Sequence, residues 1–289
     1  MFTVAEGKAN KQKKGEHLNR IDDLIKRVRQ LRPIDDAMFK KLAESKAVCQ
    51  EILRVILEDS RLVVKEVISE DSIANIFGRA VRLDALCTLG NGTLCNIEIQ
   101  KENVNDDVRR VRYNASSIVS RFSEKGQKFS EIPDVVIVYI SEYDVFRSGR
   151  TIYHIDSVIR ETNTTVNDGL SRVFVNTQYA DTDNTDVGEL MKCFLQKEIN
   201  SDKFPELSER LTFFKNAGKG VDSMCDIIKD YAKEYAKEYA DERAAEMLIK
   251  YVDTLVETTG SINKACDLLK ITRKQYDDAK ELLEKSLTV

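Results

Sequence analysis

Histidine, tryptophan and proline are scarce in this chain of 289 residues, which contains two, none and three of them. The two histidines, His17 and His154, lie far apart, so neither a histidine-based nucleophilic triad nor a histidine-rich metal site is expected. The six cysteines show no C-x-x-C spacing, which argues against a zinc knuckle and against a disulfide framework. Any chemistry of this chain is therefore expected to use carboxylates.

Long apolar runs are also absent. No run approaches the ~20 residues that span a bilayer, and the N-terminus has no apolar segment typical of a signal peptide. We therefore expect a cytoplasmic protein with reduced thiols and no membrane partner. The length suffices for one large core or two smaller domains.

Positive charge is concentrated at the start of the chain. Residues 1–32 hold nine Lys or Arg and four acids, whereas the whole chain has a net charge of −4, so the leader is +5 and the rest is −9. We expect residues 1–32 to form a flexible basic leader. Such an arm can contact a polyanion such as nucleic acid, and it can equally be a solvated tail.

The apolar spacing predicts alternating helices and strands up to about residue 200. The Gly90-Asn91-Gly92 turn indicates a hairpin, and an apolar run at 133–140 is typical of a strand covered on both faces. A helix between strands favours an α/β fold. The expected elements are helix 35–57, strand 61–70, strands 81–89 and 93–101, helix 105–124, strand 133–140, strands 150–159 and 171–180, and helix 187–196.

Residues 201–289 form a separate region of almost purely helical pattern. Within 231–246, tyrosines recur every fourth residue, which a packed stripe on a solvated helix explains better than a special tyrosine site. After Gly260, two helical segments flank a short break at 270–272. This pattern fits a helix-turn-helix-like end and also fits an ordinary helical hairpin.

The stretch LDALCTLGNGTLCNIEIQK, residues 83–101, places two acids in strands that otherwise look buried. Centring the hairpin on Asn91 puts Asp84 opposite Glu98, with Gln100 on the same face. Opposed carboxylates repel, and a divalent cation such as Mg²⁺ neutralises them well. The alternative is a solvated edge hairpin, with Asp84 paired to Arg82 or Arg79 and Glu98 paired to Lys101.

Asp84, the hairpin and the sequence Glu98-Ile99-Gln100 resemble the active-site signature of the PD-(D/E)XK nuclease superfamily. The resemblance is to the branch of PD-(D/E)XK nuclease family transposases and recombination-promoting nucleases, in which E-x-Q replaces E-x-K. It covers roughly residues 33–200. It also includes Asp35, Asp36, Phe39 and Lys40 of the first helix, Arg109, Arg112, Tyr113 and Gly126 after the motif, and the strand PDVVIVYI.

The resemblance implies a restriction-endonuclease-like α/β core, a mixed sheet flanked by helices, followed by the helical C-terminal region. It implies that Asp84, Glu98 and Gln100 are catalytic. Asp84, Glu98 and the carbonyl of Ile99 would bind Mg²⁺, or Mn²⁺, with Glu51 of the first helix as a further ligand. Gln100 can orient water but brings no positive charge, which separates this chain from the lysine-containing superfamily pattern.

The same resemblance implies Mg²⁺-dependent hydrolysis of DNA, in recombination or in a mobile element. We expect Arg109, Arg112, Arg121 and Lys125 to contact phosphates, although a solvated charged face has the same pattern. The C-terminal helices are expected to support a homo-oligomer or DNA contact. The rival interpretation is a catalytically weak or inactive nuclease fold that binds DNA through its leader and helical tail.

Overall fold

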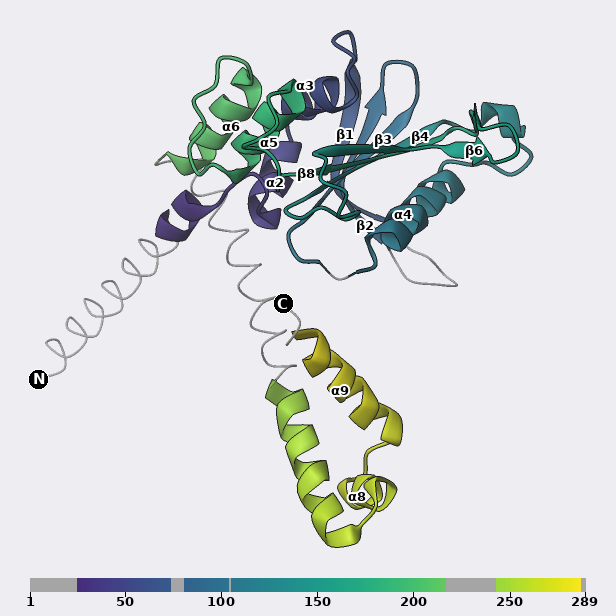
Figure 1. The fold of residues 1–289 in the computed structure, drawn as a ribbon, viewed down its shortest axis with the longest axis vertical. Coiled ribbons are helices and arrows are strands. Elements are labelled where there is room, and N and C mark those ends of the chain that lie inside the picture. Colours follow the sequence, from purple (N-terminus) through teal and green to yellow (C-terminus); the bar gives the residue numbers. More distant parts are fainter. Residues whose placement is uncertain (1–24, 74–80, 104, 217–242, 287–289) are drawn as a thin grey trace, which may run out of the picture. The chain divides into compact units, whose positions relative to one another are not determined.

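A computed structural model describes residues 25–73, 81–103, 105–216 and 243–286, which fall into two compact units. The first unit contains the described residues up to 216, and the second contains those from 243 (Figure 1). The tyrosine-rich stretch 231–242 lies outside the described residues. The first unit extends beyond residue 200, where we expected it to end, because a further helix packs back onto it.

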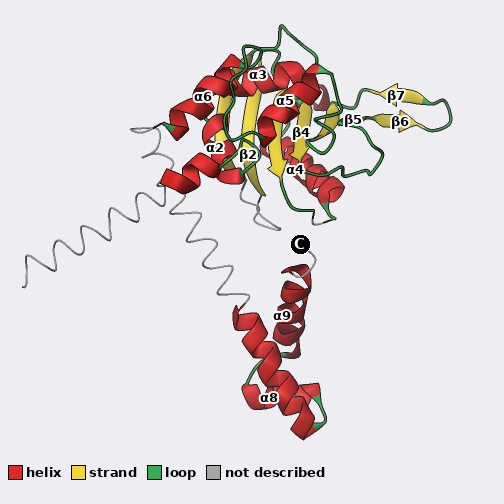
Figure 2. Cartoon of the chain, turned by 60° about the vertical axis from the view of Figure 1, so that its left-hand side comes forward, coloured by secondary structure: helices red, strands yellow, loops and turns green. Residues whose placement is uncertain are grey.

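A mixed six-stranded sheet forms the centre of the first unit (Figures 1 and 2). Its first three strands form an antiparallel meander, the next two run parallel to the third, and the last is an antiparallel edge. In spatial order the strands are β1 (Val64–Ile73), β2 (Val81–Leu89), β3 (Leu94–Gln100), β4 (Val135–Ser141), β8 (Leu170–Asn176) and β5 (Ile152–Ile155). The restriction-endonuclease-like fold class expected from the sequence is confirmed.

Helices flank this sheet (Figure 2). One helix, α4, packs Val111, Ala115 and Ile118 against apolar residues of β2, β3 and β4. Several shorter helices lie together beside β1 and β2 (Figure 1). After a helical stretch at residues 25–30, the described helices of the first unit are α2 (Asp36–Ala43), α3 (Lys46–Ile56), α4 (Asp107–Arg121), the 3₁₀ turn η1 (Phe129–Glu131), α5 (Asp186–Leu195) and α6 (Pro205–Lys215).

Two predicted elements are divided in the structure. The helix expected over 35–57 is two helices, α2 and α3, because Ser45 takes the N-cap position of a new helix and its Oγ accepts a hydrogen bond from the Val48 amide at 3.4 Å. The strand expected over 150–159 is also two strands. β5 pairs in the main sheet, whereas β6 (Ser157–Ile159) pairs with β7 (Thr164–Val166), a strand that we did not expect.

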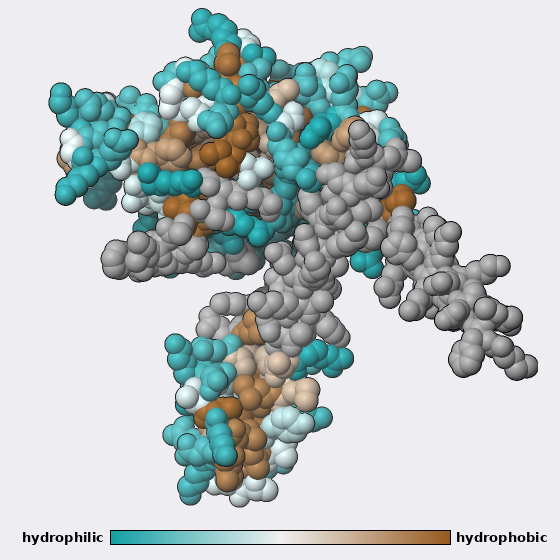
Figure 3. Space-filling model, turned by 180° about the vertical axis from the view of Figure 1, so that it is seen from behind, coloured by the Kyte–Doolittle hydropathy of each residue, from teal (hydrophilic) through white to brown (hydrophobic). Residues whose placement is uncertain are grey.

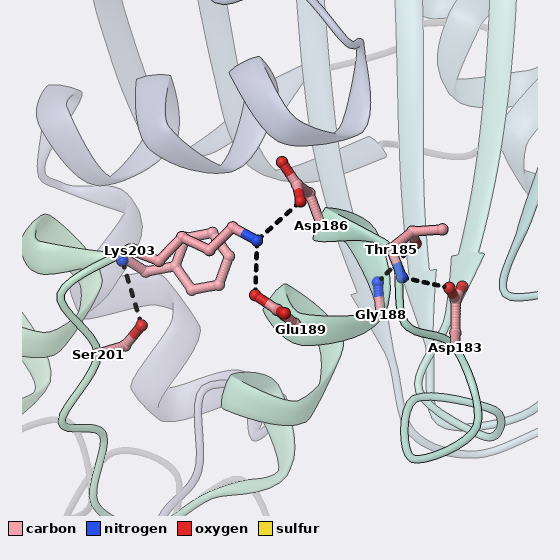
Figure 4. Close-up of polar contacts among 8 residues, drawn as sticks. Asp183, Thr185, Asp186, Gly188, Glu189, Ser201 and Lys203 are labelled. Carbon is pink, nitrogen blue, oxygen red and sulfur yellow. Dashed lines mark hydrogen bonds and ion pairs between the residues drawn. The ribbon is translucent and has the colours of Figure 1, made fainter.

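Charged and polar contacts around α5 connect the segment before α6 to that helix (Figure 4). Lys203 Nζ lies 2.7 Å from Asp186 and 2.6 Å from Glu189, two acids in the first turn of α5. Thr185 caps the same helix by accepting the Gly188 amide at 3.2 Å. Acids near a helix N-terminus are stabilised by its dipole, so this cluster ties the loop before α6 to α5.

The last residues of the expected leader belong to the first unit. Residues 25–30 are helical, and Val28 is fully buried. Lys215 of α6 donates hydrogen bonds from its ammonium to the backbone carbonyls of Arg29 and Lys197. The expectation of a flexible leader is therefore wrong for residues 25–32, whereas residues 1–24 lie outside the described part.

The second unit is a small helical assembly. Residues 243–259 are helical, and α8 (Ile262–Leu269) and α9 (Arg273–Ser286) follow, joined at Lys270 in the left-handed conformation with φ of 56°. Val252, Cys266 and Tyr276 form the core, and Figure 3 shows apolar side chains gathered along this unit. The expected break at 270–272 is confirmed. No described helix is long and apolar enough to cross a membrane.

Candidate active site

The β2–β3 hairpin brings Asp84 and Glu98 together. The backbone pairs run from Thr88–Leu94 to Ala85–Ile97, which is the register obtained by centring the hairpin on Asn91. One step further, the Ile99 amide donates to the Asp84 carboxylate at 3.0 Å. The side chain of Asp84 thus replaces a backbone acceptor of β2, and the two strands separate where the acids lie.

Strict alternation places Leu83 and Leu86 on opposite faces of the sheet. In the structure both residues belong to the same core cluster, which packs against α4. Leu83 and Leu86 therefore share one core cluster although strict alternation separates them, while β2 stays paired with β1 from Val81 to Leu83.

Both acids are buried. Asp84 is 9% exposed and Glu98 is 5% exposed. Burial raises the pKa of Asp84 to about 6, and burial together with the charge of Asp84 raises the pKa of Glu98 to about 8. The described surroundings of the two acids therefore stabilise their negative charge less well than water does.

Asn96 is the polar neighbour of Glu98 on β3. It is fully buried, and its Nδ2 donates to Glu98 Oε1 at 2.7 Å. Its Oδ1 has no hydrogen-bond partner among the described residues. Sequence reasoning missed this residue, although a polar residue two positions before Glu98 in an apolar strand points to the same face.

Gln100 makes two hydrogen bonds of its own. Its Nε2 donates to the Glu102 carbonyl at 2.8 Å, and its Oε1 accepts from Arg110 Nη1 at 2.5 Å. Arg110 comes from α4, and its positive charge lowers the pKa of Glu98, opposing the effect of burial. The neighbouring Lys101 points away to Asp35, with Nζ 2.8 Å from Oδ1.

Glu51 does not lie with these residues. Both of its carboxylate oxygens accept backbone amides at the start of α6, from Glu206 at 3.1 Å and from Leu207 at 2.9 Å. The described residues contain no group of three or more His, Cys, Asp or Glu placed to hold one ion. The expectation that Glu51 joins Asp84 and Glu98 as a ligand is therefore wrong: it caps α6, whose first amides lack partners within the helix.

The geometry of the hairpin agrees with what comparison with known families shows. A family model described as PD-(D/E)XK nuclease family transposase matches residues 33–284. The chain belongs to this family. Neither a curated protein nor a solved structure matches it.

Family membership makes the chain a nuclease-fold hydrolase of the transposase type, which implies DNA as its partner. The match also corrects the extent of the resemblance. We expected it to end near residue 200, but it includes the helices α6, α8 and most of α9. The second unit is thus part of the family's sequence pattern.

The four basic residues expected to contact DNA are exposed in this nuclease-fold protein. Arg109 and Arg112 lie on α4, Arg121 ends that helix, and Lys125 follows it. Arg109 also lines a cleft of about 380 Å³ at the start of α4, together with Arg147. Their exposure leaves them accessible to a phosphate backbone, and their role remains a prediction.

The start of α4 is fixed by a buried network that sequence reasoning also missed. Asp107 is 4% exposed, and its Oδ1 accepts hydrogen bonds from Tyr139 and Tyr143, each at 2.6 Å. Tyr139 of β4 is the register partner of Glu98 on β3. Sequence alone could not find this network, because Asp107 lies 32 and 36 residues before the two tyrosines.

Proposed function

We propose that this chain is a metal-dependent DNA endonuclease that hydrolyses phosphodiester bonds, with Asp84, Glu98 and Gln100 at its active site. The observation that supports the proposal best is the buried pair Asp84 and Glu98, placed at the point where β2 and β3 separate. Burying a carboxylate costs its hydration, so acids kept in the interior of a sheet indicate a functional role.

The residues present fit a hard divalent cation, Mg²⁺ or Mn²⁺. Carboxylate and carbonyl oxygens are the ligands that such ions prefer. The carbonyl of Ile99 lies on the same side of β3 as its amide, and that amide faces Asp84. The fully buried Asn96 Oδ1, which lacks a described partner, is a further oxygen beside Glu98. Asp84, Glu98 and the Ile99 carbonyl would hold the ion.

A bound divalent cation supplies charge neutralisation at a phosphate and a more acidic water. The residues of this chain prepare the site for it. The Ile99 amide orients Asp84, and the Asn96 amide orients Glu98. Gln100 would position a water through the one N–H and the one lone pair that its bonds to Glu102 and Arg110 leave. Arg109, Arg112, Arg121 and Lys125 would contact the DNA backbone.

The second unit is proposed to contribute oligomerisation or DNA contact. Its helix 243–259 exposes Met247 and Tyr251, one turn apart, and α8 exposes Leu268. Large exposed apolar residues are typical of a surface that meets another chain. The start of α9 presents Arg273 and Lys274, which suit a phosphate backbone.

Supercoiled-plasmid nicking tests the proposed function. Wild type and Glu98→Gln are incubated with Mg²⁺, with Mn²⁺ and with EDTA. We expect wild type to nick DNA with either metal but not with EDTA, and the variant to lose this activity. Isothermal titration with Mn²⁺ should show that the variant has also lost metal binding. Equal nicking by both proteins would reject the site.

A binding-only protein is the second candidate, favoured by the occupied amide of Gln100, whose two ends already bond to Glu102 and Arg110. A nuclease fold without turnover would bind DNA in a salt-dependent way and show no metal-dependent nicking. If wild type binds DNA but nicks no plasmid with either Mg²⁺ or Mn²⁺, the binding-only function is supported.

A further inference from the structure

We propose that Arg110 supplies, from α4, the positive charge at the scissile phosphate that a lysine at the position of Gln100 would otherwise provide. Gln100 acts in this arrangement as the positioning residue that holds the guanidinium beside Glu98. The inference rests on the proposed function, since it assigns a role within the same active site.

The contact between the two side chains is direct. Arg110 Nη1 donates to Gln100 Oε1 at 2.5 Å, and the other end of the Gln100 amide is fixed on the Glu102 carbonyl. A lysine could not accept a hydrogen bond from a guanidinium, whereas a glutamine can. The glutamine of the E-x-Q sequence is therefore matched to an arginine partner.

The backbone that carries Arg110 is rigidly placed. Asp107, three residues earlier on α4, accepts hydrogen bonds from Tyr139 and Tyr143 in the protein interior. Because Tyr139 is the register partner of Glu98, this network fixes the first turn of α4 relative to the strand that bears Glu98. Residues three apart lie on the same side of a helix, so Arg110 is directed to the same region.

The guanidinium also remains accessible to a ligand. The side chain of Arg110 is 32% exposed, and its Nε lies 4.0 Å from Asp106, at the outer limit of an ion pair. Its planar group has five N–H donors, of which Gln100 accepts one. A guanidinium matches the geometry of a phosphate and stays charged at every physiological pH.

Two variants test the assignment together. Arg110→Ala should lower Mg²⁺-dependent nicking by about 100-fold, the usual effect of removing one donor that stabilises a transition state. Adding Gln100→Lys to Arg110→Ala should raise the nicking rate again by at least about tenfold, because the new side chain on β3 supplies a positive charge. Millimolar guanidinium should partly restore Arg110→Ala alone. The matched control is Arg61→Ala, an exposed arginine three residues before β1.

Metal and DNA binding provide readouts that do not need turnover. Arg110→Ala should bind Mn²⁺ at least as tightly as wild type, since it removes a positive charge near the acids. Its log affinity for a DNA duplex should fall less steeply with log salt, by ~0.9, as expected for one phosphate contact fewer.

The outcomes separate this inference from the proposed function. Nicking by Arg110→Ala at the wild-type rate overturns the role of Arg110 and leaves the endonuclease intact. If wild type binds DNA but never nicks it, the endonuclease proposal fails. The salt slope then decides on Arg110, because an unchanged slope overturns its phosphate contact and a lower slope supports it.

Discussion

The two halves of the β2–β3 hairpin differ in what they bury. In the half near the turn, Cys87 pairs with Cys95, and both residues are buried. A hydrogen bond with Cys49 and burial raise the pKa of Cys87, and burial raises the pKa of Cys95. In the open half, the strands separate and bury Asp84 and Glu98. The same pair of strands thus builds core at one end and a candidate active site at the other.

Burial alone does not distinguish the turn half of the hairpin from its open half. Thiols are neutral at physiological pH and fill space, so burying them is favourable. Carboxylates lose their hydration when buried, and this cost is recovered only if a cation or a hydrogen-bonding shell meets them. Asn96, the Ile99 amide and Arg110 form part of that shell.

The largest expected effect comes from removing an acid of the open half. Asp84→Asn should reduce Mg²⁺-dependent cleavage by at least ~100-fold, because loss of a ligand exceeds the effect of losing an outer contact. The measurement is plasmid nicking, with circular dichroism to check the fold. The matched control is Cys95→Ala in the turn half, which should keep the activity and lose only packing. Equal losses in both variants would contradict the comparison.

A strong effect on stability is expected at the start of α4. Asp107→Ala leaves the buried hydroxyls of Tyr139 and Tyr143 without their acceptor, and should lower the free energy of unfolding by about 2–3 kcal/mol. Urea denaturation measures this change. Its control is Asp106→Ala, since Asp106 makes no side-chain cap bond, and its loss should stay below ~0.5 kcal/mol. Similar midpoints for the two variants would count against the network.

The pH dependence of stability should distinguish the two halves as well. The pKa of Glu98 is raised in the folded protein to about 8, so the folded state holds a proton that the unfolded state releases near pH ~4.3. The contribution of Glu98 to the stability of the metal-free wild type should therefore be largest below pH ~4 and be lost as pH rises toward 8.

The variant Glu98→Gln removes this dependence. Its unfolding free energy should exceed that of wild type increasingly from pH ~5 to ~8, by on the order of 1–3 kcal/mol. Thermal unfolding in EDTA at several pH values measures the difference, and Cys95→Ala is the control that should keep the wild-type profile. A constant difference across this range would show that Glu98 is not buried as described.

The smallest expected effect concerns the basic leader. Deleting residues 1–24, and not 1–32, keeps Val28 in place, because that residue is part of the core. If the leader contacts phosphates, the deletion should flatten the salt dependence of DNA affinity while nicking of plasmid at low salt persists. Fluorescence anisotropy with a labelled duplex gives the slope, and an unchanged slope would make residues 1–24 a passive tail.

Much of the fold was predictable from local pattern. The Gly90-Asn91-Gly92 turn and period-two alternation predicted the hairpin and its register up to Ala85 and Ile97, and the apolar run at 133–140 predicted the strand β4. Boundaries that depend on single residues were less predictable. Ser45 could have occupied the middle of one long helix, and only its cap geometry divides α2 from α3.

The sequence by itself determined the two acids, the hairpin that carries them and the family to which the chain belongs, because these depend on neighbouring residues and on the turn between the strands. Only the tertiary structure decided which other residues join them. Glu51 lies on the predicted helix but caps α6, whereas Arg110 reaches Gln100 because Asp107 fixes α4 to Tyr139. Contacts of this kind depend on how distant elements pack, and no local period encodes them.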